Sequence, residues 1–387
     1  MTADSIGAAT ASAAGDTQMS DDRSDDRSDD RVQFSVEELL TSGEYTEPLV
    51  ANGVRCHGGF DADGVYFSPR VVHRAPAIKA WQHQLQREGH ELIEIPSDLM
   101  PPPHPNVAQA KLLLQNDVRD PIVRALTIIS IVEGFGAMIR DVEVPDLASL
   151  LVEPFEGTAL AHLTSGLFEA HARDESGYRE EGGHKQMWEA ARDAALENPK
   201  IPGDVLMRLM SGRGRSQRPA PAFPQIAPQL ERMLGFMANV LVVEVFATGT
   251  FRWGIELLSD PEVSAAPEEA GGMVRNIEAD EKPHVDYLRT ALSEVRARTI
   301  RTTDGKEIAG SVVVDALLHR VLHQMTRNRR RDQQEDLRQG LIRAMEVASN
   351  PQALLEEFDA LETQWSPPER TGFEPAEPAE PAAALSE

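Results

Sequence analysis

The chain has 387 residues, of which 41% are hydrophobic, enough for one large domain or two ordinary ones with a sizeable core. The formal net charge of −25 argues against nucleic acid or an anionic membrane as the main partner, because both are negatively charged. The single cysteine, Cys56, excludes a disulfide within the chain and an all-cysteine metal site.

Both ends of the chain have the composition of disordered tails. Residues 1–32 are acidic and of low complexity, with Ser-Asp-Asp-Arg occurring three times in succession. Such a segment cannot bury enough apolar surface to order itself, and it lacks the apolar stretch of a signal peptide. Residues 366–387, rich in Pro, Glu and Ala, form the second predicted tail. We therefore expect a cytoplasmic protein with disordered ends.

Residues 33–105 differ from the rest of the chain because their apolar runs are short and broken by glycine. Asp63-Gly64 is a typical hairpin turn, and residues 90–96 (HELIEIP) have the pattern of a further strand. The prolines at 101–103 and 105 separate this part from the residues after it. We predict a small mixed N-terminal region.

From residue 106 to 365 the apolar residues recur with helical periodicity. Helices are predicted at 107–117, 121–141, 158–173, 177–197, 229–258, 267–298, 311–328 and 332–348. The proline-rich segment 219–228 divides them into two halves. The fold class expected from this pattern is mainly α.

Each half contains a glutamate inside an otherwise apolar helix, Glu133 within 128–139 and Glu244 within 239–249. A lone buried carboxylate costs several kcal/mol unless it is paired or binds a metal. Met233–Phe251 is about long enough to span a bilayer, but Glu244 at its centre favours a buried core helix. No basic residue lies at helical spacing beside either glutamate, so the sequence suggests inward carboxylates that serve a common site.

A Glu-x-x-His motif follows each of these glutamates. The first joins Glu181 to His184, and the second joins Glu281 to His284. Residues three apart on a helix project from nearly the same face, so each motif can present an oxygen and a nitrogen ligand together. The chain order is that of a carboxylate-bridged di-metal site inside a four-helix bundle.

This order of ligands resembles the ferritin-like di-iron carboxylate superfamily, which includes soluble oxygenases, desaturases, the small ribonucleotide reductase subunit and the ferritins. The resemblance implies a ferritin-like four-helix bundle over 106–365, with extra helices and C-terminal helices around it. It also implies a site for two iron ions, or for one manganese and one iron. The ligands it implies are Glu133, Glu181, His184, Glu244, Glu281 and His284.

Two further positions fit the resemblance. An acidic residue precedes each motif glutamate, giving Glu180 and Asp280. In di-iron oxygenases an acid at this position commonly hydrogen-bonds the far nitrogen of a ligand histidine, and this fixes the orientation of the imidazole. Thr248 lies one turn after Glu244. In the bacterial multicomponent monooxygenases a threonine at this spacing faces the oxygen-binding pocket, so Thr248 is a candidate catalytic residue for proton relay.

Both halves depart from the family pattern. Gly182-Gly183 lies inside the first motif, and Pro283 lies inside the second. These residues weaken an ideal helix, so we expect kinks or π-bulges beside the ligands. The gap from Glu133 to Glu181 is also longer than the gap from Glu244 to Glu281. The first half therefore leaves alternatives open: Glu169 is a rival ligand by spacing, and His171 or Glu175 could replace part of the set.

Other histidines give weaker signals. His319 and His323 stand one turn apart, but an apolar stripe marks their segment as a core-packing helix. The pair Cys56-His57 has no matching ligands nearby in the sequence and is interpreted as structural.

Four carboxylates and two imidazoles form a hard oxygen and nitrogen set, which suits iron or manganese. The resemblance implies an O2-dependent non-haem di-iron oxygenase or oxidase that acts on a small organic substrate through a peroxo-diferric intermediate. The alternative is a ferritin-like ferroxidase or iron-handling protein. A radical-generating reductase subunit is disfavoured, because that family usually has tyrosine where this chain has Trp188.

The sequence contains no flavin or nicotinamide fingerprint. We therefore expect reducing equivalents to come from an external electron donor, such as a ferredoxin or a reductase. The remaining expectations on partners are a small-molecule substrate, no nucleic acid and no membrane, with a homodimer left open.

Overall fold

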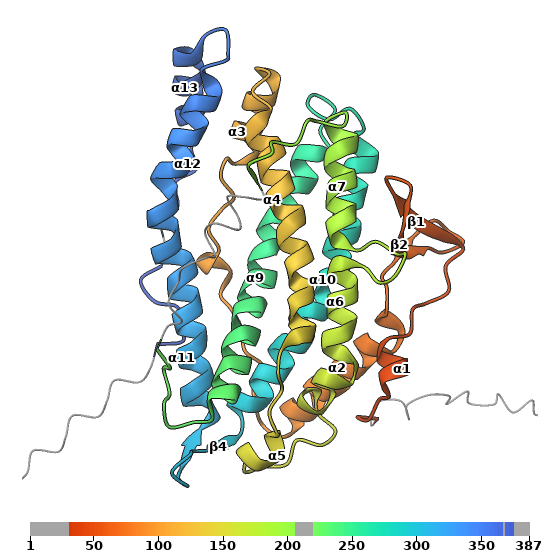
Figure 1. The fold of residues 1–387 in the computed structure, drawn as a ribbon, viewed down its shortest axis with the longest axis vertical. Helices are drawn as coiled ribbons and strands as arrows, with labels where there is room; N and C mark the ends of the chain where they lie inside the picture. The colour runs from red at the N-terminus through yellow and green to blue at the C-terminus, as the bar shows by residue number, and fades with distance from the viewer. Residues whose placement is uncertain (1–30, 206–219, 367, 375–387) are drawn as a thin grey trace, which may run out of the picture. The chain divides into compact units, whose positions relative to one another are not determined.

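The computed structural model describes residues 31–205, 220–366 and 368–374 and confirms the mainly α fold (Figure 1). The predicted tail at 1–32 lies almost entirely outside these residues. The longer helices, in chain order, are α2 (Val71–Arg87), α3 (Val107–Gln115), α4 (Asp120–Gly136), α6 (Phe168–Ser176), α7 (His184–Ala195), α9 (Pro228–Leu258), α10 (Pro267–Arg296), α11 (Gly310–His323), α12 (Arg329–Met345) and α13 (Pro351–Ala360).

Short elements connect these helices. The short helices are α1 (Val36–Leu39), α5 (Leu147–Leu150), η1 (Ser97–Leu99), η2 (Ala137–Asp141), η3 (Ala159–His162), η4 (Leu163–Leu167) and η5 (Gln324–Asn328). The strands are β1 (Glu47–Ala51), β2 (Val54–Phe60), β3 (Tyr66–Phe67), β4 (Thr299–Arg301) and β5 (Glu307–Ala309). They form one three-stranded and one two-stranded antiparallel sheet.

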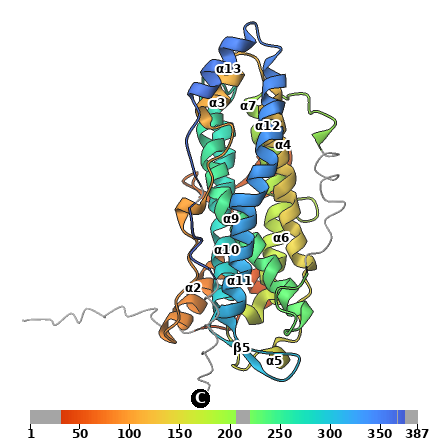
Figure 2. The ribbon, with the colours of Figure 1, turned by 90° about the vertical axis from the view of Figure 1, so that its left-hand side faces the viewer.

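The central helices pack side by side along their length. Helix α9 packs along α10, α10 along α7, and α4 along both α6 and α7 (Figures 1 and 2). Helices α4, α9 and α10 each begin with a proline in the first turn, at Pro121, Pro228 and Pro267. Proline suits this position because its missing N–H has no intrahelical partner there. Helix α11 covers α9 and α10 from outside.

The predicted helix at 177–197 begins later in the structure, at His184. Helix α6 ends at Ser176 because Gly177 has φ 80° and ψ 178°, a backbone conformation open essentially only to glycine. The chain then bends toward β2, where the Gly182 amide donates to the Arg55 carbonyl at 2.8 Å. The expected irregularity beside Gly182 is thus a complete break between α6 and α7, whereas α10 continues through Pro283.

Gly177→Ala is expected to destabilise the protein by about 3 kcal/mol or more, because it combines backbone strain with a clash. A Cβ atom at this position would overlap the backbone of Glu181 and Gly182. Gly64→Ala is the matched control, since Gly64 also has a positive φ, +76°, but nothing lies within 4 Å of its added Cβ. That control should cost about 1–2 kcal/mol. Equal losses in urea unfolding would show that the turn at Gly177 tolerates a side chain.

The N-terminal region packs onto the bundle. The hairpin turn predicted at Asp63-Gly64 joins β2 to β3, with the Asp61 side chain accepting from the Val65 amide at 2.9 Å. Residues 90–96, predicted as a strand, pair with no strand in the described chain, and the Ile93 amide donates to Ser293 on α10 at 2.8 Å. The described residues from Val32 onward belong to one compact unit.

Part of the predicted C-terminal tail also returns to the bundle. Phe373 is buried in the main core, and the Arg327 guanidinium donates to the Pro368 carbonyl at 2.6 Å. Residues 375–387 lie outside the described chain.

Two hydrophobic core clusters follow each other along the helices. On α9, buried residues up to Val242 belong to the first cluster and those from Phe251 belong to the second. On α10 the order is reversed, with the second cluster ending at Ile277 and the first beginning at Tyr287. A layer of buried polar side chains lies between the two clusters.

Two helices are long and apolar enough to cross a membrane by length and composition, Asp120–Asp141 and Pro228–Leu258. They include α4 and α9, which carry Glu133 and Glu244 into the polar layer. Both helices pack against other helices of the unit, so packing inside the bundle also accounts for their apolar sequences.

Candidate metal centre

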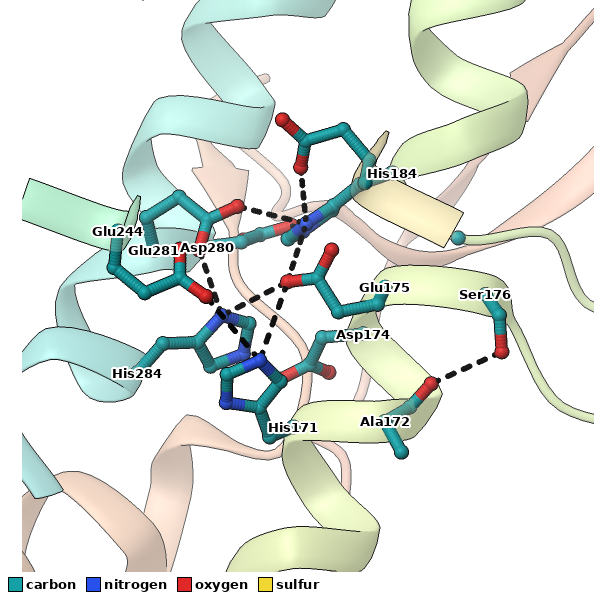
Figure 3. A network of polar contacts seen from close by, with 12 residues as sticks. His171, Ala172, Asp174, Glu175, Ser176, His184, Glu244, Asp280, Glu281 and His284 are labelled. Carbon is teal, nitrogen blue, oxygen red and sulfur yellow. Dashed lines mark hydrogen bonds and ion pairs between the residues drawn. The ribbon is translucent and has the colours of Figure 1, made fainter. Parts of the chain in front are cut away.

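The polar layer collects carboxylates and imidazoles from all the central helices (Figure 3). Helix α6 contributes His171 and Glu175, and α7 contributes its first residue, His184. The other members are Glu133 on α4, Glu244 on α9, and Glu281 and His284 on α10.

These side chains form two groups whose ligand atoms lie within 4.8 Å of one another. One group is Glu133, Glu175, His184 and Glu281, and the other is His171, Glu175, Glu244 and His284. Each group therefore offers four oxygen and nitrogen ligand atoms to one ion, and Glu175 belongs to both groups.

Glu175 and Glu281 lie between the two groups. One carboxylate oxygen of Glu281 is 2.8 Å from His184 Nδ1, and the other is 2.7 Å from His284 Nδ1. Glu175 Oε1 is 3.5 Å from His184 Nδ1 and 3.2 Å from His284 Nδ1. Carboxylates placed in this way can bridge two metal ions.

His171 completes the second group. Its Nε2 is 3.3 Å from Glu244 Oε1, and its ring stacks on that of His284 at a centroid distance of 3.9 Å. Its Nδ1 lies 3.1 Å from the Tyr287 hydroxyl, which can orient the ring. The arrangement points the remaining nitrogen of His171 toward the cluster.

An aspartate beyond the cluster faces the far nitrogen of each of the other two histidines. Asp174 Oδ2 is 2.9 Å from His284 Nε2, and Asp280 Oδ2 is 3.5 Å from His184 Nε2. Each aspartate directly precedes a cluster glutamate in the sequence. The acid expected at Asp280 is thus beside its histidine, whereas its counterpart in the first half is Asp174 and not Glu180.

Two buried arginines neutralise Asp174. Arg70 Nε donates to Asp174 at 2.8 Å, and Arg74 Nη1 lies 2.7 Å from its other oxygen. Burial opposes the charge of Asp174, but the two guanidinium groups outweigh this effect and hold its pKa well below the ordinary value. Asp174 therefore stays ionised as a fixed acceptor for His284.

The N-terminal sheet supplies the surroundings of Asp280. The Tyr66 hydroxyl donates to Asp280 at 2.8 Å, and His57 Nε2 lies 3.8 Å from the same oxygen. The His57 and His184 rings are 5.5 Å apart. The pair Cys56-His57, interpreted from sequence as structural only, thus places His57 beside the cluster. Burial and the charge of Arg70 lower the pKa of His57, so its ring stays neutral.

Buried charge makes the cluster costly without cations. Burial, followed by the charges of Glu175 and Glu281, raises the pKa of Glu133 well above its ordinary value. Burial and the same two carboxylates raise that of Glu244. Burial disfavours a charged His184, yet Glu281 and Glu175 outweigh it and raise the pKa of this histidine. In the metal-free protein, Glu133, Glu244 and His184 thus hold protons that compensate part of the buried negative charge. Divalent cations would compensate this charge when bound.

Unsatisfied polar atoms provide a direct test of whether metal ions fit. Several buried atoms of the cluster make ion-pair contacts but no hydrogen bond of normal geometry in the described chain: Glu175 Oε1, one oxygen of Glu281, His171 Nε2 and both ring nitrogens of His184. The second oxygen of Glu175 has no hydrogen-bond partner either. Such orphaned atoms are rare in proteins because each costs about 1–3 kcal/mol. Metal coordination would satisfy them, so these buried groups can hold metal ions.

The structure brings together five of the six ligands expected from the sequence and places Glu181 elsewhere. Glu181 lies in the turn before α7, with its side chain 41% exposed and 3.5 Å from Arg55 Nε. It lines a separate cavity of 520 Å³ together with Arg55 and His57. The break at Gly177 removes Glu181 from the helix that its motif required.

Of the alternatives left open in the first half, the structure places His171 and Glu175 in the ligand groups and Glu169 outside them. Glu169 instead accepts from Arg173 at 2.7 Å and lies 3.6 Å from Arg140. A signal for Glu175 was present in the sequence, because Asp174-Glu175 repeats the dipeptide Asp280-Glu281. No comparable signal identified Arg70 or Tyr66, which reach the site from distant segments.

The other candidates lie outside the two ligand groups. Thr248 is on α9 one turn after Glu244 and lines a cavity of 210 Å³. His319 and His323 stack on each other on α11, with ring centroids 6.0 Å apart.

Comparisons with protein-family models, with curated proteins and with solved structures found no match to this chain.

Proposed function

We propose that the protein is an O2-dependent non-haem di-iron oxygenase or oxidase, built on a ferritin-like four-helix bundle, that acts on a small organic substrate. The observation that carries the proposal is the placement of Glu175 and Glu281 between two groups of oxygen and nitrogen ligands. A single ion would leave one group unused, whereas two ions sharing both carboxylates would use all seven side chains.

The oxygen and nitrogen donors of this site suit iron better than metals that prefer sulfur ligands. The donors are carboxylate oxygens and imidazole nitrogens, and no cysteine takes part. The four glutamates carry four negative charges when ionised, which balance two divalent ions. When bound, a pair of ferrous ions supplies the electrons with which O2 is activated.

The protein's own residues would control access and geometry. Asp174, Asp280 and Tyr287 orient the three cluster histidines through their far nitrogens. The hydrophobic clusters on either side of the polar layer exclude water from it. A dry site with fixed ligands favours reaction with a bound organic molecule over release of a reactive product.

Reducing equivalents would come from outside the chain. We keep a ferredoxin or a separate reductase as the proposed electron donor and the cytoplasm as the proposed location. A ferritin-like ferroxidase is the alternative, and the two functions differ in the fate of the iron.

Anaerobic loading with Fe(II) is expected to give about two bound iron ions per chain, one for each ligand group. After exposure to O2 the iron should remain bound, because all its ligands lie inside the bundle. Iron content is measured after desalting, and O2 uptake is followed with an electrode.

Two outcomes would contradict this proposal. An iron content near zero, or a single zinc ion, would rule out the di-iron site. If excess Fe(II) is oxidised catalytically and accumulates as a ferric mineral, the ferroxidase function is correct instead.

A further inference from the structure

A small cavity lies between α9, α10 and the extended segment 91–96. Its volume is 210 Å³. The lining is mostly aliphatic, with one hydroxyl and one charged pair at its polar part. The lining residues are Ile93, Glu94, Ile95, Leu241, Val245, Thr248, Val285 and Arg289.

Helical register places this cavity next to the candidate metal centre. On α9, Leu241 and Thr248 line the cavity, and Glu244 lies on the same stripe, three and four residues from them. On α10, Val285 lies one turn after Glu281, and Arg289 lies one turn further on. The rise from Glu281 to Arg289 is about 12 Å along the helix. The cavity is lined by residues one turn from Glu244 and Glu281 and not by the ligands themselves, so a small molecule in it can contact Arg289 and extend toward the turns that carry these two glutamates.

The polar part of the cavity is built around Arg289. Its Nη1 donates to Glu94 at 2.9 Å and its Nη2 donates to Asp286 at 2.8 Å. Lys282 also pairs with Asp286, so two cations and two anions balance at this point. The third donor of Arg289, Nε, is buried without a hydrogen-bond partner among the described residues.

This donor indicates the chemistry of the occupant. A buried N–H without an acceptor costs free energy that a ligand oxygen would recover. Because the guanidinium charge is already balanced, an uncharged acceptor fits better than a further carboxylate. An apolar cavity of about 150 Å³ can hold benzene. A volume of 210 Å³ thus limits the occupant to one ring with a small substituent, or a short aliphatic chain.

We propose that this cavity binds the organic substrate of the metal centre, and that the substrate is a small, neutral, mainly apolar molecule with one oxygen acceptor directed at Arg289 Nε. The assignment of the occupant as substrate rests on the proposed function, whereas binding itself does not. Thr248 lines the cavity, so it would contact the bound substrate and not the metal ligands.

Three probes of similar size test the chemistry. Acetophenone is neutral and carries an acceptor, ethylbenzene lacks the acceptor, and benzoate replaces it with a charge. Binding to the full chain is measured by NMR titration. Acetophenone should bind about tenfold more tightly than either of the other two, because a hydrogen bond to a charged donor contributes about 1.5–3 kcal/mol. Arg289→Met should remove the preference for acetophenone over ethylbenzene.

The location is tested by filling the cavity. Ile95→Trp enters from the covering segment and leaves the ligand helices unchanged, so it should abolish acetophenone binding while metal content stays the same. His90→Trp adds the same side chain at an exposed position nearby and should have no effect. Unchanged binding in Ile95→Trp, or equal affinity for the three probes, would overturn the proposal.

To test whether the cavity lies near the metal centre, the centre is loaded with paramagnetic Mn²⁺ or with diamagnetic Zn²⁺. The methyl protons of bound acetophenone should relax faster in the Mn²⁺-loaded protein than in the Zn²⁺-loaded protein. If metal is taken up but this enhancement is absent, the cavity is not the substrate site and the di-metal proposal stands. If no metal is taken up, the proposed function fails, whatever the probes do.

Discussion

Glu175→Ala is expected to abolish the binding of both metal ions, lowering iron content from about two per chain to nearly none. Glu175 is the one carboxylate that belongs to both ligand groups, so each ion would lose an oxygen ligand, and one of the two carboxylates placed between the groups is removed. Metal binding to a site of this kind depends steeply on ligand number. Iron is measured after anaerobic loading and desalting, and helix content is followed by circular dichroism.

Glu181→Ala is the matched control for this experiment. Glu181 is the residue that the sequence motif selects, but the structure places it beside Arg55 with a partly exposed side chain. Its replacement should leave iron content unchanged. The reverse result, retention of iron in Glu175→Ala and loss in Glu181→Ala, would mean that the turn at 177–183 rearranges when metal binds.

Arg74→Met is expected to destabilise the metal-free protein by about 3 kcal/mol, since it removes one of the two buried guanidinium groups that face the buried Asp174 carboxylate. Arg74 is completely buried and lies 2.7 Å from Asp174, which is also buried. Arg70 alone would then balance Asp174. The loss is measured as the change in free energy of unfolding in urea, without added metal.

The comparison for this variant is Arg338→Met, which removes an exposed bidentate pair with Asp359. Exposed pairs contribute about 0–1 kcal/mol, so this control should be nearly neutral. If Arg74→Met is as mild as Arg338→Met, the charge of Asp174 is not the reason for the buried arginines. A second replacement, Asp174→Asn in the Arg74→Met background, should add to the loss, because it leaves the buried Arg70 guanidinium without its carboxylate.

The sequence predicted the helices that depend on local pattern. The expected segments at 107–117, 229–258 and 267–298 correspond to α3, α9 and α10 within a few residues. Their apolar periodicity, and the first-turn prolines of α9 and α10, are properties of a single segment, which is why these helices could be predicted without a structure. Helix α2 was missed because Pro76 and several polar residues interrupt its pattern, and its burial comes from contacts with α10.

The candidate site was predictable only where ligand spacing follows an unbroken helix. Glu281 and His284 meet this condition, and so do the lone glutamates of α4 and α9. In the first half, the chain leaves the helix at Gly177 and returns at His184, so a three-residue spacing no longer means a shared face. On the preceding helix, the carboxylate beside His184 is that of Glu175, nine residues before it, and not that of Glu181.

The residues around the ligands could not be predicted for a different reason. Arg70, Tyr66 and His57 come from the N-terminal region and reach the cluster only after the sheet and α2 have packed onto the bundle. No periodicity or spacing within the sequence encodes such contacts, because they depend on tertiary packing between segments more than a hundred residues apart.

The polar layer between the two hydrophobic clusters has a consequence for cooperativity. Each cluster can pack as a unit of its own, and in the metal-free chain the two units meet across a layer of buried polar side chains, where Glu133 and Glu244 hold protons and several atoms lack hydrogen bonds. Openings confined to this layer then cost less free energy than global unfolding. Bound ions would replace these protons and form bonds to side chains of all the central helices. The same ligands would therefore decide whether the bundle unfolds in two stages or in one.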